Sequence, residues 1–193
     1  MRCFTLILAL TLLYLPQLLA QSAEREPAAA FQVDRLSVSQ LEGFRLKGLE
    51  KISDFAELLE KYQDTSLAPE IRNQCQTMIL NLFYKEDSQL FYYNNKQQLK
   101  PIKLNQFLEK ISKLNHKLVI KHPIESDTLP IQVGDTYQLK TEIELQTTNK
   151  AQKETKQLVA LEVIIKKEIK SFGTEKIEIW QALLGNMTIP VRP

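Results

Sequence analysis

The sequence predicts a single α+β domain in which helices precede a curved antiparallel sheet. Through its first half, apolar residues recur every three or four positions, which is typical of helices with one buried face. In the last third, polar and apolar residues alternate along three long runs, which is typical of strands with one buried face. The 193 residues, 44% hydrophobic and 25% charged, suit one globular domain, which we expect at 38–189 with a tail at 190–193.

Residues 1–20 are predicted to be a signal peptide, because Arg2 is followed by an apolar run. The alternative is an uncleaved anchor, but the run is short for a span and Pro16 interrupts it. Residues 21–37 then form a flexible leader. We therefore expect an exported protein, periplasmic or extracellular, with no membrane span after cleavage. Cys75 is the one cysteine left, and its place on a helical stripe predicts a buried thiol rather than a reactive one.

Two long helices are predicted to form an antiparallel hairpin, because only a short turn separates them. Ser37 and Ser39 are both suitable N-caps for the first helix, and Gly43 and Gly48 weaken it. Pro69 opens the second helix. The first stripe consists of Val38, Leu41, Phe44, Gly48, Ile52, Phe55, Leu59 and Tyr62, and the second of Ile71, Cys75, Met78, Ile79 and Leu82.

Shorter elements follow the hairpin. We expect strands at 90–93 and 99–102 around a turn at Asn94 and Asn95, a third helix at 104–114, a strand at 117–122 and a loop at 124–134. Three long strands at 136–146, 158–170 and 176–184 then form a meander.

Strand alternation predicts which side chains face the helices. The inward set contains Tyr137, Leu139, Thr141, Ile143 and Leu145, then Val159, Leu161, Val163, Ile165 and Ile169, then Ile177, Ile179, Gln181 and Leu183. All acidic residues of these strands fall on the outer face, which leaves little equipment for acid–base catalysis inside. Trp180, Ile164 and Ala182 would form an outer apolar patch, either an interface or a surface that a loop covers.

Metal, cofactor and nucleic-acid chemistry find little support in the sequence. His116 and His122 would be about 20 Å apart along a strand, too far to share a metal ion. No glycine-rich phosphate loop is present, so we expect no cofactor. The net charge of +2 gives no reason to expect a nucleic acid partner.

The order of elements resembles the nuclear transport factor 2-like (cystatin-like α+β) superfamily, particularly its exported bacterial members of unknown role. The resemblance rests on Phe55–Leu59 ending one helix, Leu67–Glu70 opening the next, the helix around Phe107 and Leu108, and the closing segment Trp180–Ile189. It implies a cone-shaped sheet around an inner pocket, and dimers through the sheet face. Enzymes of this superfamily need an Asp base inside, and no inner-face Asp matches that role here.

We therefore expect an exported, non-enzymatic binding or scaffold domain for a small apolar ligand or a protein partner, with a homodimer through the sheet face. The alternative is a pocket enzyme of isomerase or lyase type on the same fold. Candidate ligand-binding residues are Tyr62, Tyr84, Tyr92, Tyr137 and Gln181. Candidate interface residues are Ile164, Trp180 and Ala182.

Overall fold

A computed structural model describes residues 35–114, 116–121, 128–148 and 154–190, apart from the Phe172 side chain. The predicted signal peptide and most of the predicted leader lie outside these residues, as do His122 and Lys150. The elements along the described chain are α2 (Val38–Gln63), α3 (Pro69–Leu82), β1 (Gln89–Tyr93), β2 (Leu99–Lys103), α4 (Leu104–Ile111), β3 (Lys117–Lys121), β4 (Ile131–Val133), β5 (Thr136–Thr148), β6 (Glu154–Phe172) and β7 (Glu175–Thr188).

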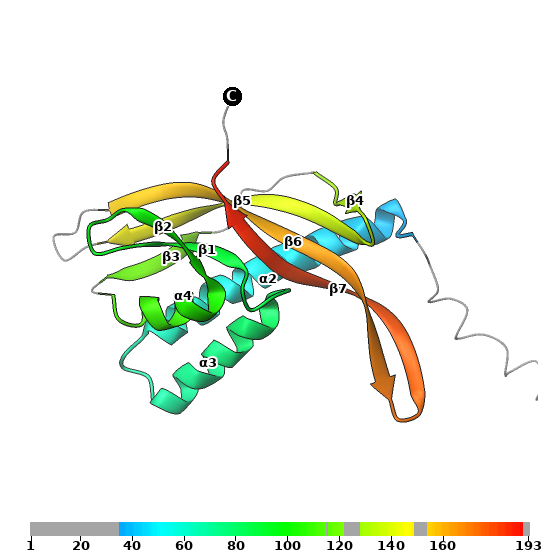
Figure 1. Ribbon diagram of the computed structural model, residues 1–193, viewed down its shortest axis with the longest axis horizontal. Coiled ribbons are helices and arrows are strands. Elements are labelled where there is room, and N and C mark those ends of the chain that lie inside the picture. Colours follow the sequence, from blue (N-terminus) through cyan, green and yellow to red (C-terminus); the bar gives the residue numbers. More distant parts are fainter. Residues whose placement is uncertain (1–34, 115, 122–127, 149–153, 191–193) are drawn as a thin grey trace, which may run out of the picture.

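The main sheet is antiparallel and follows the order β3-β5-β6-β7, with β4 also paired to β5. β1 and β2 form a separate antiparallel hairpin. Figure 1 shows the long strands curling over α2, with α3 and α4 beside it, and the β6–β7 hairpin projecting beyond the helices. The α+β prediction is therefore confirmed, including the helical hairpin at its start. β4 was missed, because it lies within the predicted loop.

Local sequence signals set the ends of the helices. Ser37, rather than Ser39, caps α2: its Oγ accepts from the Gln40 N–H at 3.3 Å, and the Gln40 side chain accepts from the Ser37 N–H at 2.8 Å. Pro69 opens α3 as predicted. α2 runs unbroken through both of its glycines. No described helix has both the length and the apolar character needed to cross a membrane.

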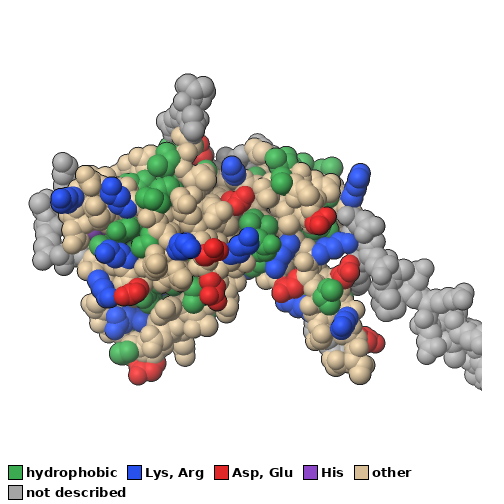
Figure 2. Space-filling view, viewed as in Figure 1, with side chains coloured by type: hydrophobic (Ala, Val, Ile, Leu, Met, Phe, Trp, Pro, Cys, Tyr) green, Lys and Arg blue, Asp and Glu red, His purple; other side chains and the backbone are tan. Residues whose placement is uncertain are grey.

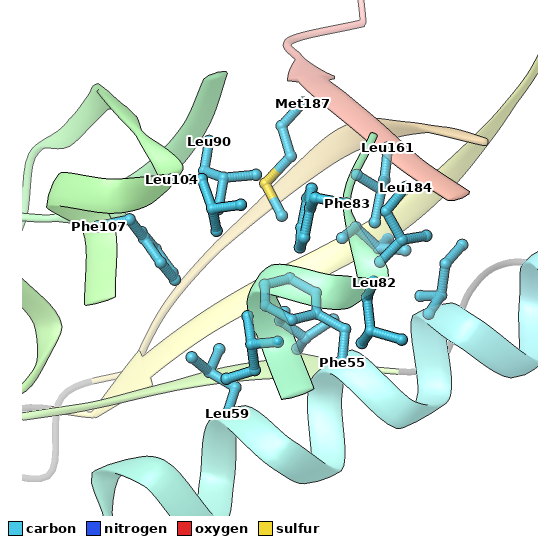
Figure 3. Close-up of a cluster of buried hydrophobic side chains, with 14 of the residues drawn as sticks. Phe55, Leu59, Leu82, Phe83, Leu90, Leu104, Phe107, Leu161, Leu184 and Met187 are labelled. Carbon is cyan, nitrogen blue, oxygen red and sulfur yellow. The ribbon is translucent and has the colours of Figure 1, made fainter. Parts of the chain in front are cut away.

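The space between the sheet and the helices is filled by apolar side chains from every layer (Figure 3). Phe55 of α2 meets Phe83 edge to face at 5.1 Å between ring centroids and lies 6.5 Å from the Phe107 ring of α4. Leu90 of β1 and Leu184 of β7 belong to the same cluster, and neither side chain is exposed to solvent. Burial of these side chains supplies the main force that holds the layers together.

The predicted stripes are not buried along their whole length. Val38, Ile71 and Met78 belong to the stripes but are 69%, 45% and 53% exposed, because they lie where no other element covers the helix. The packed body also begins before the predicted boundary at Val38. Leu36 is buried, and its N–H donates to the Tyr137 hydroxyl at 3.1 Å.

The face prediction is right for β5 and wrong for β7. Trp180, Ala182 and Leu184 lie opposite Lys167, Ile165 and Val163 of β6, so they share the face that covers α2. Ala182 and Leu184 are buried. The alternation of β7 leaves both of its faces partly apolar, so its pairing with β6 decides between them. The predicted outer patch of Ile164, Trp180 and Ala182 therefore does not exist as one surface.

Two further features separate the sheet from its predicted form. β7 holds one more residue than β6 between the pairs Leu161–Met187 and Val163–Leu184, which is a β-bulge. The bulge returns Met187 to the buried face after Leu184. Ile169 lies on the predicted face, opposite Glu178 of β7, but it is 63% exposed, because the hairpin extends beyond the helices there (Figure 1).

Candidate functional site

A groove of about 300 Å³ lies between α2 and β7, near the start of the projecting hairpin. In Figure 2 the surface is hollowed where this hairpin leaves the body. The groove is lined from α2 by Phe44, Lys47, Glu50, Lys51 and Asp54, and from β7 by Trp180, Gln181 and Ala182.

The helical wall of the groove follows from the periodicity of α2. Residues three and four apart lie on one side of a helix, so Phe44, Lys47 and Lys51 form one row and Glu50 and Asp54 lie beside it. The Lys47 ammonium lies 5.4 Å from the centroid of the Phe44 ring. This wall therefore carries both signs of charge around an aromatic ring. Sequence reasoning missed it as a site; the charged positions next to the apolar stripe were the available signal.

The strand wall is centred on Trp180. Its ring lies 5.6 Å from the Tyr137 ring at 64°, and the Lys167 ammonium lies 5.5 Å from its centroid. Because Tyr137 is itself held by the Leu36 N–H, the indole is well supported. The Trp180 Nε1 is buried without a hydrogen-bond partner among the described residues, as is the Oε1 of Gln181, whose side chain lies on the opposite face of β7. Buried polar atoms without partners are uncommon in folded proteins, so this wall is not fully satisfied.

β7 is the last strand of the sheet, and its outer edge is covered only in part. The Leu184 carbonyl accepts from the Tyr84 N–H at 2.7 Å, and Phe83 forms an isolated bridge to Leu184. Farther along, the Asn186 Oδ1 accepts from the Gln89 N–H at 2.8 Å. The segment after α3 therefore covers the second half of the edge.

The first half of the same edge has no such cover within the described residues. Backbone groups of successive residues point to opposite sides of a strand. Because those of Leu184 point away from β6, those of Ala182, Trp180, Glu178 and Lys176 do so too. Within the described chain, no backbone hydrogen bond reaches these four outward positions. We call the stretch Lys176–Ala182 the open edge.

The candidate ligand-binding residues do not come together. Tyr62 is buried and donates to the Leu108 carbonyl at 3.1 Å, and Tyr92 and Tyr137 are also buried in the core. Tyr84 lies on the other side of β7, with the Lys166 ammonium 4.9 Å from its ring centroid.

Three of the other candidates do meet. Gln181 lines the groove together with Trp180 and Ala182, which the sequence predicts as interface residues. Ile164 is buried and is paired with Leu183 on the opposite face of the sheet.

The described interior offers few polar groups. Apart from tyrosines and Cys75, its buried polar side chains are Ser88, Thr141 and Thr147. Burial raises the pKa of Tyr93, and the Glu144 carboxylate adds to the rise. The described residues contain no group of His, Cys, Asp and Glu side chains that would hold a metal ion.

Comparison with known proteins adds no relative. No protein-family model matches the chain, and neither a curated protein nor a solved structure is found to be similar to it.

Proposed function

We propose that this protein is a non-enzymatic binding domain that takes an extended segment of a protein partner along the open edge of β7. The observation that carries this proposal is the row of outward backbone groups at Lys176, Glu178, Trp180 and Ala182. An extended segment that adds to a sheet satisfies such groups through its own main chain. Side chains of the segment on one face would then reach the adjoining groove.

The groove supports the same proposal through its composition. Trp180 and Phe44 offer flat apolar surface, and the charges of Lys51 and Asp54 on α2 select partners by complementarity. A peptide group supplies both an acceptor for an indole N–H and a donor for an amide oxygen. A small rotation of Trp180 would satisfy its unpartnered Nε1 in this way, whereas the Gln181 side chain lies on the opposite face of β7.

Two wider expectations belong to this proposal. The apolar run at 1–20 supports export of the chain to the periplasm or the extracellular space. The order of two long helices, a short hairpin, a third helix and a meander supports kinship with the nuclear transport factor 2-like superfamily. A small apolar ligand in the groove is the competing occupant.

The test uses a random peptide library displayed on phage and a variant that blocks the edge. The Glu178 N–H points away from β6, so Glu178→Pro removes an outward donor and keeps the β6–β7 ladder. Glu178→Ala is the matched control, because it removes the same side chain and keeps the donor. Selected peptides should bind Glu178→Pro about tenfold or more weakly than wild type and Glu178→Ala about equally.

Equal binding of the selected peptides to the wild type and Glu178→Pro would refute edge addition. A library that yields no binder would do so as well. Circular dichroism melts of both variants should remain close to the wild-type melt, which shows that the sheet is intact.

A further inference from the structure

We propose that the segment that occupies the first part of the open edge, up to Ile179, is β7 of a second copy of this chain, paired antiparallel so that Lys176 lies opposite Glu178 of the partner subunit. This inference rests on the proposed edge-addition function and names its partner. It departs from the expected dimer through the sheet face, because the contact is edge to edge and makes one continuous sheet.

The geometry of a twofold pair leaves few registers. Paired residues must lie on the same face of the joined sheet, so the pair is centred on a single residue of β7. Pairing also cannot extend to Leu184, because the Tyr84 N–H already occupies its carbonyl. A centre at Trp180 or Gln181 would bring Lys176 or Glu178 opposite Leu184, so the centre must lie earlier in the strand, at Ile177, Glu178 or Ile179.

Charge selects among these three centres. A centre at Glu178 places this carboxylate opposite itself, and like charges directly opposite are destabilising. A centre at Ile179 places Glu178 opposite Trp180 of the partner subunit and forms no ion pair. A centre at Ile177 places Lys176 opposite Glu178 of the partner subunit, and symmetry repeats that pair. Only this register converts both charges of the edge into attractive contacts.

The surroundings of the edge favour the same arrangement. The hairpin projects from the body, so a second copy can approach it without meeting the helices (Figure 1). Figure 2 shows side chains of both charge signs on this hairpin. Glu178 is 3.6 Å from the Lys167 ammonium, yet about half of its side chain is exposed, so its other oxygen can accept from Lys176 of the partner subunit. Half-buried Ile177 would meet its symmetry mate on the opposite face.

A contact of this size gives a weak dimer. It involves a few residues of one strand from each copy, well below the area of a standard interface. We therefore expect a dissociation constant in the micromolar range or weaker, and association that depends on protein concentration.

The test is a charge swap measured by sedimentation equilibrium of the purified chain. Lys176→Glu and Glu178→Lys each create two like-charge pairs in the homodimer, and each should raise the dissociation constant about tenfold. An equimolar mixture of the two variants should form a heterodimer near wild-type affinity. The double variant Lys176→Glu/Glu178→Lys should also dimerise again.

Recovery of dimerisation in the mixture and in the double variant would show that the single variants lose affinity through charge repulsion in this register. A folding defect in the single variants would not be repaired by mixing them or by combining the substitutions. Glu178→Lys also removes the contact with Lys167, so urea unfolding of each variant at low concentration serves as control. A wild type that stays monomeric to about 1 mM overturns the second copy as occupant. The proposed pairing is also overturned if the wild type dimerises and neither Lys176→Glu nor Glu178→Lys changes the dissociation constant.

These failures are distinct from failure of the proposed function. A monomeric wild type that still binds library peptides in an edge-dependent way keeps edge addition and loses only the second copy. Both proposals are supported if Glu178→Pro dissociates the dimer and if dimerisation is restored in the mixture of the two charge variants and in the double variant.

Discussion

α2 approaches the sheet closely at Gly48, and this contact makes the sharpest stability prediction. A Cβ built on Gly48 would lie 2.7 Å from Val163 Cγ1 and 3.1 Å from Val163 Cγ2. Val163 is fully buried in β6, with β5 and β7 on either side of it. Its methyl groups therefore have little room to move, and Gly48→Ala forces the helix and the strand apart.

Two opposing effects set the size of the change. Alanine gains about 1 kcal/mol over glycine in a helix interior, whereas overpacking a filled core costs about 1–3 kcal/mol. Gly43→Ala is the matched control on the same helix, because Gly43 is exposed and nothing lies within 4 Å of its added Cβ. The difference between the unfolding free energies of the two variants is free of the helix-propensity effect, because both replace a helical glycine by alanine. Gly48→Ala should therefore be about 1–3 kcal/mol less stable than Gly43→Ala.

Urea unfolding followed by circular dichroism measures both free energies. Combining Gly48→Ala with Val163→Ala should cost less than the sum of the two single changes, because removing the valine methyls makes room for the new Cβ. A Gly48→Ala variant as stable as Gly43→Ala, or strictly additive costs in the double variant, would refute the close contact.

Three other changes test the interior and the bulge. Tyr62→Phe should lower the free energy of unfolding by about 0.5–1.5 kcal/mol in urea, because it removes the bond to the Leu108 carbonyl. Tyr93→Phe should be neutral or stabilising in the same assay, because that hydroxyl is buried without a described partner; equal losses in both variants would contradict this contrast. The raised pKa of Tyr93 means that the folded state disfavours the phenolate, so the free energy of unfolding falls as the pH rises above the ordinary value of 10.0. Wild-type stability should therefore fall more steeply there than that of Tyr93→Phe in melts across alkaline pH. Asn186→Ala should cost about 1 kcal/mol and speed hydrogen exchange at the Gln89 amide, and an unchanged exchange rate would show that the Asn186 Oδ1 does not protect this amide.

Short-range patterns in the sequence were sufficient to predict every described element except β4. Apolar spacing and Pro69 located both long helices, and the turn at Asn94 and Asn95 separated the two short strands. Alternation placed the buried face of β5 without error, since one of its faces is plainly polar. These signals succeed because helix and strand periods depend on neighbouring residues alone.

Faces and edges required the tertiary structure. Alternation alone predicted Gln181 inside and Trp180 outside, which is wrong. Both faces of β7 carry apolar residues, so the pairing with β6 decides between them. The groove depends on Lys51 of α2 lying beside Trp180 of β7, more than one hundred positions later in the chain. Periodicity carries no information about such distant pairs.

The sequence by itself therefore determined the α+β class, the helical hairpin and the meander, because each depends on short-range patterns of burial. Only the tertiary structure decided that β7 is the last strand, that Tyr84 covers its edge at Leu184, and that the edge from Lys176 to Ala182 is open. These features depend on which strand lies at the edge of the sheet and on which distant segments pack against it, and both are set by the fold of the whole chain.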